Sequence, residues 1–148
     1  MRQSPRLYLL DTNILVAVVR GGKLGQHIEN EYHLIAAPFR PLISVVSIGE
    51  LLKLTREFNW GEAKTRKLRE LLENLVRVEI GHPAILESYA DIACFCRKSG
   101  NSKPHNDCWI GATAKATGAV LLTTDTDFDI FHGRFIERIL IDESLASP

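Results

Sequence analysis

Short apolar runs alternate with longer amphipathic segments along this chain. The runs have the length of buried strands, and the longer segments carry apolar residues at helical spacing. Helix boundaries are indicated by Gly21-Gly22, by Pro83 in a first turn and by Gly118 after a last turn. The pattern predicts strands at residues 7–10, 41–46, 76–80, 119–123 and 138–141. It predicts helices at residues 14–20, 23–31, 47–58, 61–75, 83–99 and 104–117.

The alternation also predicts how these elements assemble. A chain of 148 residues has the size of one domain, so we expect a single domain over residues 1–148. Strands that alternate with helices favour an α/β fold with a parallel sheet covered on both faces. In such sheets, ligands bind beyond the carboxyl ends of the strands, near the point where the strand order reverses. Polar residues directly after the predicted strands are therefore the main functional candidates.

Four acidic residues occupy such positions or the first turns of a predicted helix: Asp11, Glu50, Asp107 and Asp125. Asp11 and Asp125 follow predicted strands, Glu50 lies one helical turn beyond another strand, and Asp107 lies in a first turn, so we expect them to converge. Carboxylate oxygens are the ligands that Mg²⁺ and Mn²⁺ prefer, and paired ions of this kind hydrolyse phosphodiesters. The sequence therefore predicts a carboxylate site for divalent cations.

Most of these carboxylates also have ordinary structural explanations. Ser47-x-x-Glu50 fits a capping box, in which the glutamate bonds back to the start of its helix. Asp107 interacts favourably with a helix dipole, and Asp125 is a typical turn residue. Asp11 is harder to explain in this way because it follows Leu-Leu at a buried strand end, where an unpaired carboxylate is costly. It needs a partner, and a cation is one.

Other polar residues carry weaker signals. Asp127 is expected mainly to cap a short helix that runs through Phe131. His105 lies two residues before Asp107 and is within reach of a substrate phosphate, but its setting is more typical of a solvent-facing loop. The five histidines form no metal-binding pattern, and the chain lacks both a nucleophile elbow and a glycine-rich phosphate loop.

The charge of the chain gives no general attraction to nucleic acid. Lys and Arg number 18 and so do Asp and Glu, so RNA binding requires a local basic patch. The densest basic stretch comprises Lys53, Arg56, Lys64, Arg66, Lys67 and Arg69. Interleaved glutamates are typical of a solvated, salt-bridged face, and an RNA-facing patch is the alternative. On the second interpretation Lys53, Arg56 and Arg66 contact RNA.

Cysteine usage and the N-terminus predict where the protein works. Cys94, Cys96 and Cys108 have no metal-ligand spacing, so we expect reduced core thiols in a cytoplasmic protein. The apolar N-terminal stretch is interrupted by Asp11 and Asn13, which makes it too short to span a membrane, and it has no signal-peptide cleavage pattern.

Together, the acidic motifs resemble those of the PIN-domain family, and most of all the VapC-type toxins of bacterial toxin–antitoxin pairs. The resemblance covers residues 7–141, with Gly111 standing where many relatives have Ala. It is carried by Asp11-Thr12-Asn13, Glu50-Leu51, Asp107-x-x-Ile110-x-Ala112-x-Ala114 and Thr123-x-Asp125-x-Asp127-Phe128.

The resemblance implies a three-layer α/β/α sandwich with a mostly parallel sheet of about five strands. It implies an endoribonuclease dependent on Mg²⁺ or Mn²⁺, in which the metal activates water for attack on phosphorus and no histidine base is needed. The residues implied as both metal ligands and catalytic groups are Asp11, Glu50, Asp107 and Asp125. Those implied in support, by orienting the ligands or lying beside them, are Asn13, Thr123 and Asp127.

The resemblance also implies partners. These are an RNA substrate, a cognate antitoxin protein and a second copy of the chain in a homodimer. Leucines at helical spacing in residues 51–75 must be buried by a core or by a partner helix. Two other functions stay open: a PIN-fold binding module without catalysis, and an aspartyl-phosphate phosphatase. The phosphatase usually has a second Asp where this chain has Asn13.

Overall fold

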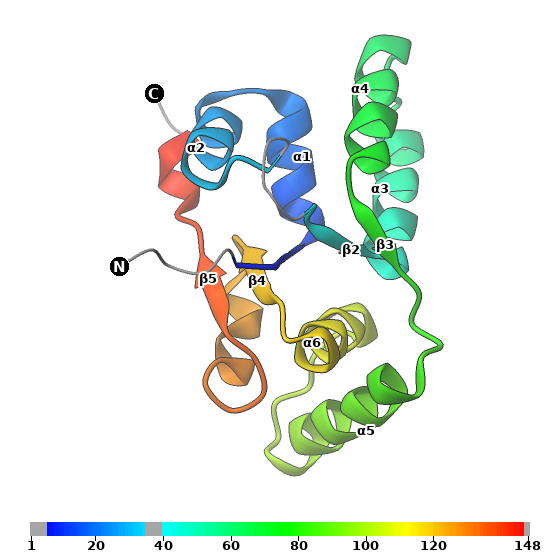
Figure 1. Ribbon diagram of the computed structural model, residues 1–148, viewed down its shortest axis with the longest axis vertical. Helices are drawn as coiled ribbons and strands as arrows, with labels where there is room; N and C mark the ends of the chain where they lie inside the picture. The colour runs from blue at the N-terminus through cyan, green and yellow to red at the C-terminus, as the bar shows by residue number, and fades with distance from the viewer. Residues whose placement is uncertain (1–5, 35–39, 147–148) are drawn as a thin grey trace.

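A computed structural model describes residues 6–34 and 40–146, which form a five-stranded parallel sheet between two layers of helices (Figure 1). The predicted α/β/α sandwich is therefore confirmed. The strands run in the order β3-β2-β1-β4-β5, and every neighbouring pair is parallel. Their bounds are β1 (Tyr8–Leu10), β2 (Leu42–Ser44), β3 (Val76–Val78), β4 (Val120–Thr123) and β5 (Arg138–Leu140).

Each face of the sheet has its own hydrophobic core. Leu10 and Leu122 belong to one core and Leu9 and Leu121 to the other, because successive strand side chains point to opposite faces. Helices α1, α2 and α4 lie on the first side, and α5 and α6 on the second (Figure 1). The helices are α1 (Thr12–Arg20), α2 (Lys23–Tyr32), α3 (Val45–Glu57), α4 (Glu62–Glu73), α5 (Pro83–Lys98) and α6 (His105–Thr117), with short 3₁₀ helices η1 (Thr126–Phe131) and η2 (Glu143–Ala146).

The boundary between β2 and α3 differs from the prediction. The strand ends at Ser44 and the helix begins at once, although Val45 and Val46 are β-branched. The reason is an N-cap, since the Ser44 hydroxyl accepts a hydrogen bond of 3.1 Å from the Val46 amide. Glu50 thus lies six positions after the cap, and the expected capping box with Ser47 is wrong.

Glycines let two pairs of elements approach closely. In α6, a Cβ at Gly111 would lie 3.3 Å from the Phe131 ring, so η1 packs directly on the helix that carries Asp107. In α2, a Cβ at Gly25 would overlap the carbonyl oxygen of Ala17 in α1. Because this oxygen belongs to the backbone of α1, it cannot move away by a side-chain rotation, and the two helices would have to separate.

Replacing Gly25 by alanine is therefore expected to lower the free energy of unfolding by about 1–3 kcal/mol, as overpacking does in other cores. Urea denaturation measures this change. The matched control is Gly49→Ala in α3, where an added Cβ meets nothing within 4 Å. There the better helix propensity of alanine is expected to stabilise the protein slightly. Equal effects of the two substitutions would contradict the close contact between α1 and α2.

Two further predictions have structural outcomes. Cys96 and Cys108 are buried, but Cys94 is exposed, so the expectation of three core thiols is wrong for Cys94. The two cysteines of α5 are two residues apart and therefore face different sides of the helix. Among the described residues, no helix is long and apolar enough to span a membrane. The single domain over residues 1–148 stays a prediction, and residues 1–5, 35–39 and 147–148 lie outside the described part.

Candidate metal centre

The acidic residues meet where the strand order of the sheet reverses. Strands β1 and β4 are adjacent in the sheet. The strand that follows β1 in the chain, β2, lies on one side of this pair, and the strand that follows β4, β5, lies on the other. Asp11 directly follows β1, and its amide donates a hydrogen bond of 3.0 Å to the carbonyl oxygen of Leu122 in β4. Thr123 ends β4 and leads to Asp125. This edge is where open α/β sheets bind ligands.

Asp11 is held in place by both of its carboxylate oxygens. It is only 5% exposed. Oδ1 accepts a hydrogen bond of 2.8 Å from the Thr12 amide, which caps α1, and Oδ2 accepts one of 2.7 Å from the Thr123 hydroxyl. Burial raises the pKa of Asp11 and the negative charge of Asp125 adds to this, while the two hydrogen bonds act in the opposite direction. The structure thus fixes a carboxylate where its charge is costly.

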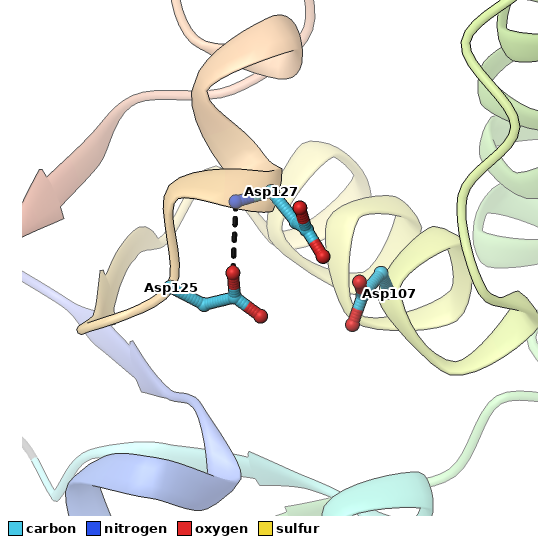
Figure 2. A group of neighbouring side chains, drawn as sticks. All are labelled: Asp107, Asp125 and Asp127. Atoms are coloured by element: carbon cyan, nitrogen blue, oxygen red, sulfur yellow. Dashed lines mark hydrogen bonds between the residues drawn. The ribbon is translucent and has the colours of Figure 1, made fainter.

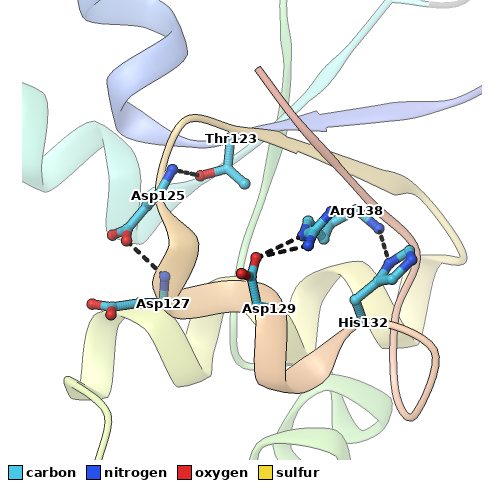
Figure 3. Close-up of polar contacts among 6 residues, drawn as sticks. All are labelled: Thr123, Asp125, Asp127, Asp129, His132 and Arg138. Atoms are coloured by element: carbon cyan, nitrogen blue, oxygen red, sulfur yellow. Dashed lines mark hydrogen bonds and ion pairs between the residues drawn. The ribbon is translucent and has the colours of Figure 1, made fainter. Parts of the chain in front are cut away.

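Thr123 connects Asp11 to the next acidic segment, and Figure 3 shows the contact from Thr123 to Asp125. Its hydroxyl accepts a hydrogen bond of 2.9 Å from the Asp125 amide. Asp125 in turn caps η1, since its Oδ1 accepts a hydrogen bond of 2.8 Å from the Asp127 amide. The expectation that Asp127 is the cap is therefore wrong, because the cap lies two residues earlier. The side chain of Asp127 therefore caps no helix and lies 3.5 Å from the Lys103 ammonium.

An ion pair anchors η1 to the last strand. Asp129 accepts hydrogen bonds from Nε and Nη2 of Arg138 at 3.1 and 2.7 Å, and the Arg138 amide donates one of 3.0 Å to His132 (Figure 3). Because one oxygen of Asp129 binds both nitrogens, the 3₁₀ helix is tied to β5. This anchor holds the segment that carries Asp125 and Asp127.

Three carboxylates lie close enough to share one ion. Asp107, Asp125 and Asp127 each offer an oxygen within 4.8 Å of the others, and Figure 2 shows the three groups turned toward a common space. Asp107 lies in the first turn of α6, as expected. Burial, and then the negative charges of the acidic residues around it, Asp125 first, together raise the pKa of Asp107 to about 7. The cluster is therefore strained by like charge.

Glu50 and Asn13 differ in how closely they approach this group. Glu50 is half-buried in α3, and its pKa is raised by burial and then by the charge of Asp11. The Glu50 charge also reaches Asp107, so Asp11, Glu50, Asp107 and Asp125 share one electrostatic environment. Asn13 is exposed in the first turn of α1, and no hydrogen bond of its side chain occurs within the described part of the chain.

The donor set suits a hard divalent cation. Every candidate ligand is a carboxylate oxygen, which is the chemistry that Mg²⁺ and Mn²⁺ prefer. In sequence next to Asp125 and one helical turn before Glu50 stand two buried hydroxyl groups that have no hydrogen-bond partner among the described residues, those of Thr124 and Ser47. Buried polar groups are normally paired, so these two hydroxyl groups are candidates to bind ordered water near the acidic residues.

The raised pKa values predict how metal-free protein responds to pH. Between about pH 4 and 7 the folded chain keeps a proton on Asp107 that the unfolded chain, with a pKa of 3.8, has lost. Because the folded chain binds more protons than the unfolded chain in this window, the free energy of unfolding falls as pH rises through it. In EDTA, the melting temperature at pH 7.5 is therefore expected to be lower than at pH 5.5. The variant Asp107→Asn should reduce the difference, and a higher melting temperature at pH 7.5 in the unaltered protein would contradict the crowded cluster.

The basic stretch of α3 and α4 is largely engaged with its own helices. Lys53 pairs with Glu57 at 3.3 Å, and Arg66 pairs with Glu62 at the same distance. The Arg56 guanidinium donates a hydrogen bond to a backbone carbonyl of its own helix. These contacts fit the salt-bridged face, and the RNA contact of Lys53, Arg56 and Arg66 stays a prediction.

Sequence reasoning missed Lys103 and misplaced His105. The Lys103 ammonium lies 3.5 Å from Oδ1 of Asp127, and its side chain is only 20% exposed. The two residues are 24 positions apart, so no local pattern connects them. His105 is the first residue of α6, not part of a loop, and its Nδ1 lies 2.9 Å from the Tyr89 hydroxyl.

The chain belongs to the PIN domain family, whose model matches residues 8–132. It is 34% identical over 88 residues to Ribonuclease VapC4 of Mycobacterium tuberculosis, a match that covers 58% of this chain and 67% of that protein. Its fold is similar to that of VapBC2 from Rickettsia felis bound to a promoter DNA fragment, with a TM-score of 0.79 and 22% identity over 92% of this chain and 99% of that one. VapBC-1 of nontypeable Haemophilus influenzae gives a TM-score of 0.73 and 24% identity over 90% and 97%. The resemblance to VapC-type PIN proteins is confirmed.

Proposed function

We propose that this protein is an endoribonuclease dependent on Mg²⁺ or Mn²⁺ and that it acts in the cytoplasm as the toxin of a type II toxin–antitoxin pair. The observation that carries the proposal is the group of carboxylates within 4.8 Å of one another, beside the buried Asp11, at the reversal of strand order. Membership of the PIN family and the relative named as a ribonuclease support it.

In this proposal Asp11, Glu50, Asp107 and Asp125 hold the ions. When bound, divalent ions lower the pKa of water and stabilise the charge that develops on the phosphate. The Thr123 hydroxyl orients Asp11 through the hydrogen bond to Oδ2.

Asp127 lies against Lys103, which partly neutralises it, so it supports the ligands and is not counted as one of them. A cation would favour the charged form of Asp107 and relieve the repulsion within the cluster.

The alternatives make different chemical demands. An aspartyl-phosphate phosphatase uses its aspartate as an exposed nucleophile, whereas Asp11 is 5% exposed and uses both oxygens as hydrogen-bond acceptors. A binding module without catalysis would keep the fold and bind a partner without cleaving RNA.

Cleavage of RNA by purified protein in Mn²⁺, and its loss in EDTA, separates the enzyme from the binding module. Asp107→Asn and Asp125→Asn are expected to abolish cleavage. Glu50→Gln is expected to do the same, since the capping role that would explain Glu50 otherwise is absent.

The proposed partners are a cognate antitoxin and a second copy of the chain. Most leucines of residues 51–75 are already buried in the core, but Leu52 of α3 and Phe58, directly after that helix, are 42% and 67% exposed. Exposed apolar side chains of this kind are available to a partner. A basic side chain of an antitoxin placed beside the acidic cluster would compete with metal for the carboxylates.

Light scattering at tens of micromolar, a concentration that populates weak interfaces, is expected to give twice the chain mass of 16.6 kDa. Phe58→Asp is a variant that tests whether α3 contributes, since it adds charge to an exposed position without touching the acidic cluster. A monomer mass for the unaltered protein would contradict the homodimer and leave the nuclease proposal standing.

A further inference from the structure

A groove between the end of α5 and the start of α6 opens beside the acidic cluster. We propose that it binds a nucleotide of the substrate RNA next to the scissile phosphate, with Arg97, Lys103 and His105 contacting the phosphate backbone. This inference rests on the proposed function and deepens it, because it assigns the substrate to a surface other than the basic stretch of α3 and α4.

The charge of the groove favours an anion. It is lined by two cations and a histidine, and none of the described residues that line it is acidic. Arg97 is exposed and forms no ion pair within the described part of the chain. This differs from Lys53 and Arg66, each of which pairs with a glutamate of its own helix. Lys103, the other cation of the groove, is paired with Asp127, so Arg97 is the cation that is free to contact a phosphate of a single-stranded backbone.

The position of the groove connects it to the candidate metal centre. Lys103 lines the groove and also lies 3.5 Å from Oδ1 of Asp127, which shares the 4.8 Å group with Asp107. Cys108, also on the groove wall, directly follows Asp107 in α6. Lys103 thus connects the groove to the acidic cluster, and a phosphate that it contacts would lie next to the carboxylates.

The size and the lining of the groove suit a nucleotide. Its volume of about 490 Å³ lies within the range of roughly 300–1,000 Å³ that is usual for small-molecule sites. Ala93, Cys96 and Cys108 give it an apolar floor for a base or ribose.

On its rim, the His105 ring is fixed by the hydrogen bond to Tyr89, and Tyr89 itself stacks on Trp109 with ring centroids 3.9 Å apart. Helix α6 also begins at this rim without a side-chain cap, and such a helix N-terminus favours phosphate.

Binding of a fluorescein-labelled, random-sequence 12-nucleotide RNA tests the proposal by fluorescence anisotropy. The full-length Asp11→Asn variant, kept in EDTA, serves as the non-cleaving background. Adding Arg97→Gln is expected to weaken binding about tenfold, the effect of losing one charged hydrogen bond. It should also reduce the slope of log affinity against log salt by about 0.7, the value for one phosphate contact on a single strand. Lys98→Gln is the matched control, since it removes the same charge one residue away and does not line the groove.

Mapping of cross-links from 4-thiouridine in the same RNA provides a second measurement. Cross-links are expected in residues 93–108. If Arg97→Gln leaves RNA affinity unchanged while Lys53→Gln or Arg66→Gln weakens it, the groove is not the RNA site, although the nuclease proposal stands. If Arg97→Gln weakens the binding of a labelled oligoglutamate peptide but leaves RNA affinity unchanged, the RNA proposal is also overturned. The groove would then bind an acidic protein partner. A protein that neither binds this RNA nor cleaves it in Mn²⁺ would overturn the proposed function as well.

Discussion

Replacing Asp11 by asparagine is expected to reduce RNA cleavage at least about a hundredfold, since loss of even an outer-shell partner of a metal ligand costs 10- to 100-fold. The side chain keeps its shape but loses one negative charge from the cluster. The asparagine oxygen still accepts the Thr12 amide, so the cap of α1 survives. In the unaltered protein the Thr123 hydroxyl donates to Oδ2 of Asp11. In the variant this hydroxyl would face the amide nitrogen of the asparagine, which cannot accept, so this hydrogen bond is lost. Catalysis is thus expected to fail while the fold persists.

A melting curve in EDTA checks that the fold persists, and the variant is expected to melt at the same temperature as the unaltered protein or higher. The reason is that burial and the charge of Asp125 make the Asp11 carboxylate costly, as its raised pKa indicates. The control is Asp91→Asn, the same substitution at a surface position paired with Lys115. It should leave cleavage unchanged. Near-normal cleavage by Asp11→Asn in Mg²⁺ or Mn²⁺ would contradict the assignment of Asp11.

Saturating Mn²⁺ is expected to raise the stability of the protein by about 3 kcal/mol when the ion is in a hundredfold excess over its dissociation constant. For a chain of this length, that corresponds to a rise in melting temperature of roughly 6–12 °C. The physical reason is that the folded chain gathers carboxylates whose repulsion the ion relieves, whereas the unfolded chain disperses them. The shift should vanish in Asp11→Asn.

Ionic strength has to be matched with NaCl in this measurement, because salt alone screens the repulsion between carboxylates. The difference between Mn²⁺ and matched NaCl then reports specific binding. A melting curve that Mn²⁺ leaves unchanged would favour a structural, metal-free role for the acidic cluster.

The fold was predictable from the sequence because local patterns determine it. Apolar runs such as residues 119–123 lie in a buried strand, and the alternation of strands and helices leads to a parallel sheet. Asp11 was recognisable for the same reason, since a carboxylate at a buried strand end must have a partner. The first-turn position of Asp107 followed from the start of its helix at residue 105.

The details of the site were less predictable because tertiary geometry decides between local alternatives. Ser44 and Ser47 are both suitable N-caps one turn apart, and only the end of β2 selects Ser44. Asp125 and Asp127 compete in the same way for the cap of η1. Lys103 carries no signal at all, because its partner Asp127 is brought to it by the packing of η1 against α6.

The central claim is that this carboxylate cluster hydrolyses RNA with a divalent metal and water. The most direct measurement is the end-group analysis of products that purified protein makes from a defined RNA in Mn²⁺ and in EDTA. Attack by water, without the neighbouring 2′-hydroxyl, predicts products free of 2′,3′-cyclic phosphate and a substrate that remains cleavable when the scissile nucleotide is 2′-deoxy. Cleavage is expected only in Mn²⁺ or Mg²⁺. Cleavage that persists in EDTA and yields cyclic phosphate, or the absence of any cleavage in Mn²⁺, would contradict the account.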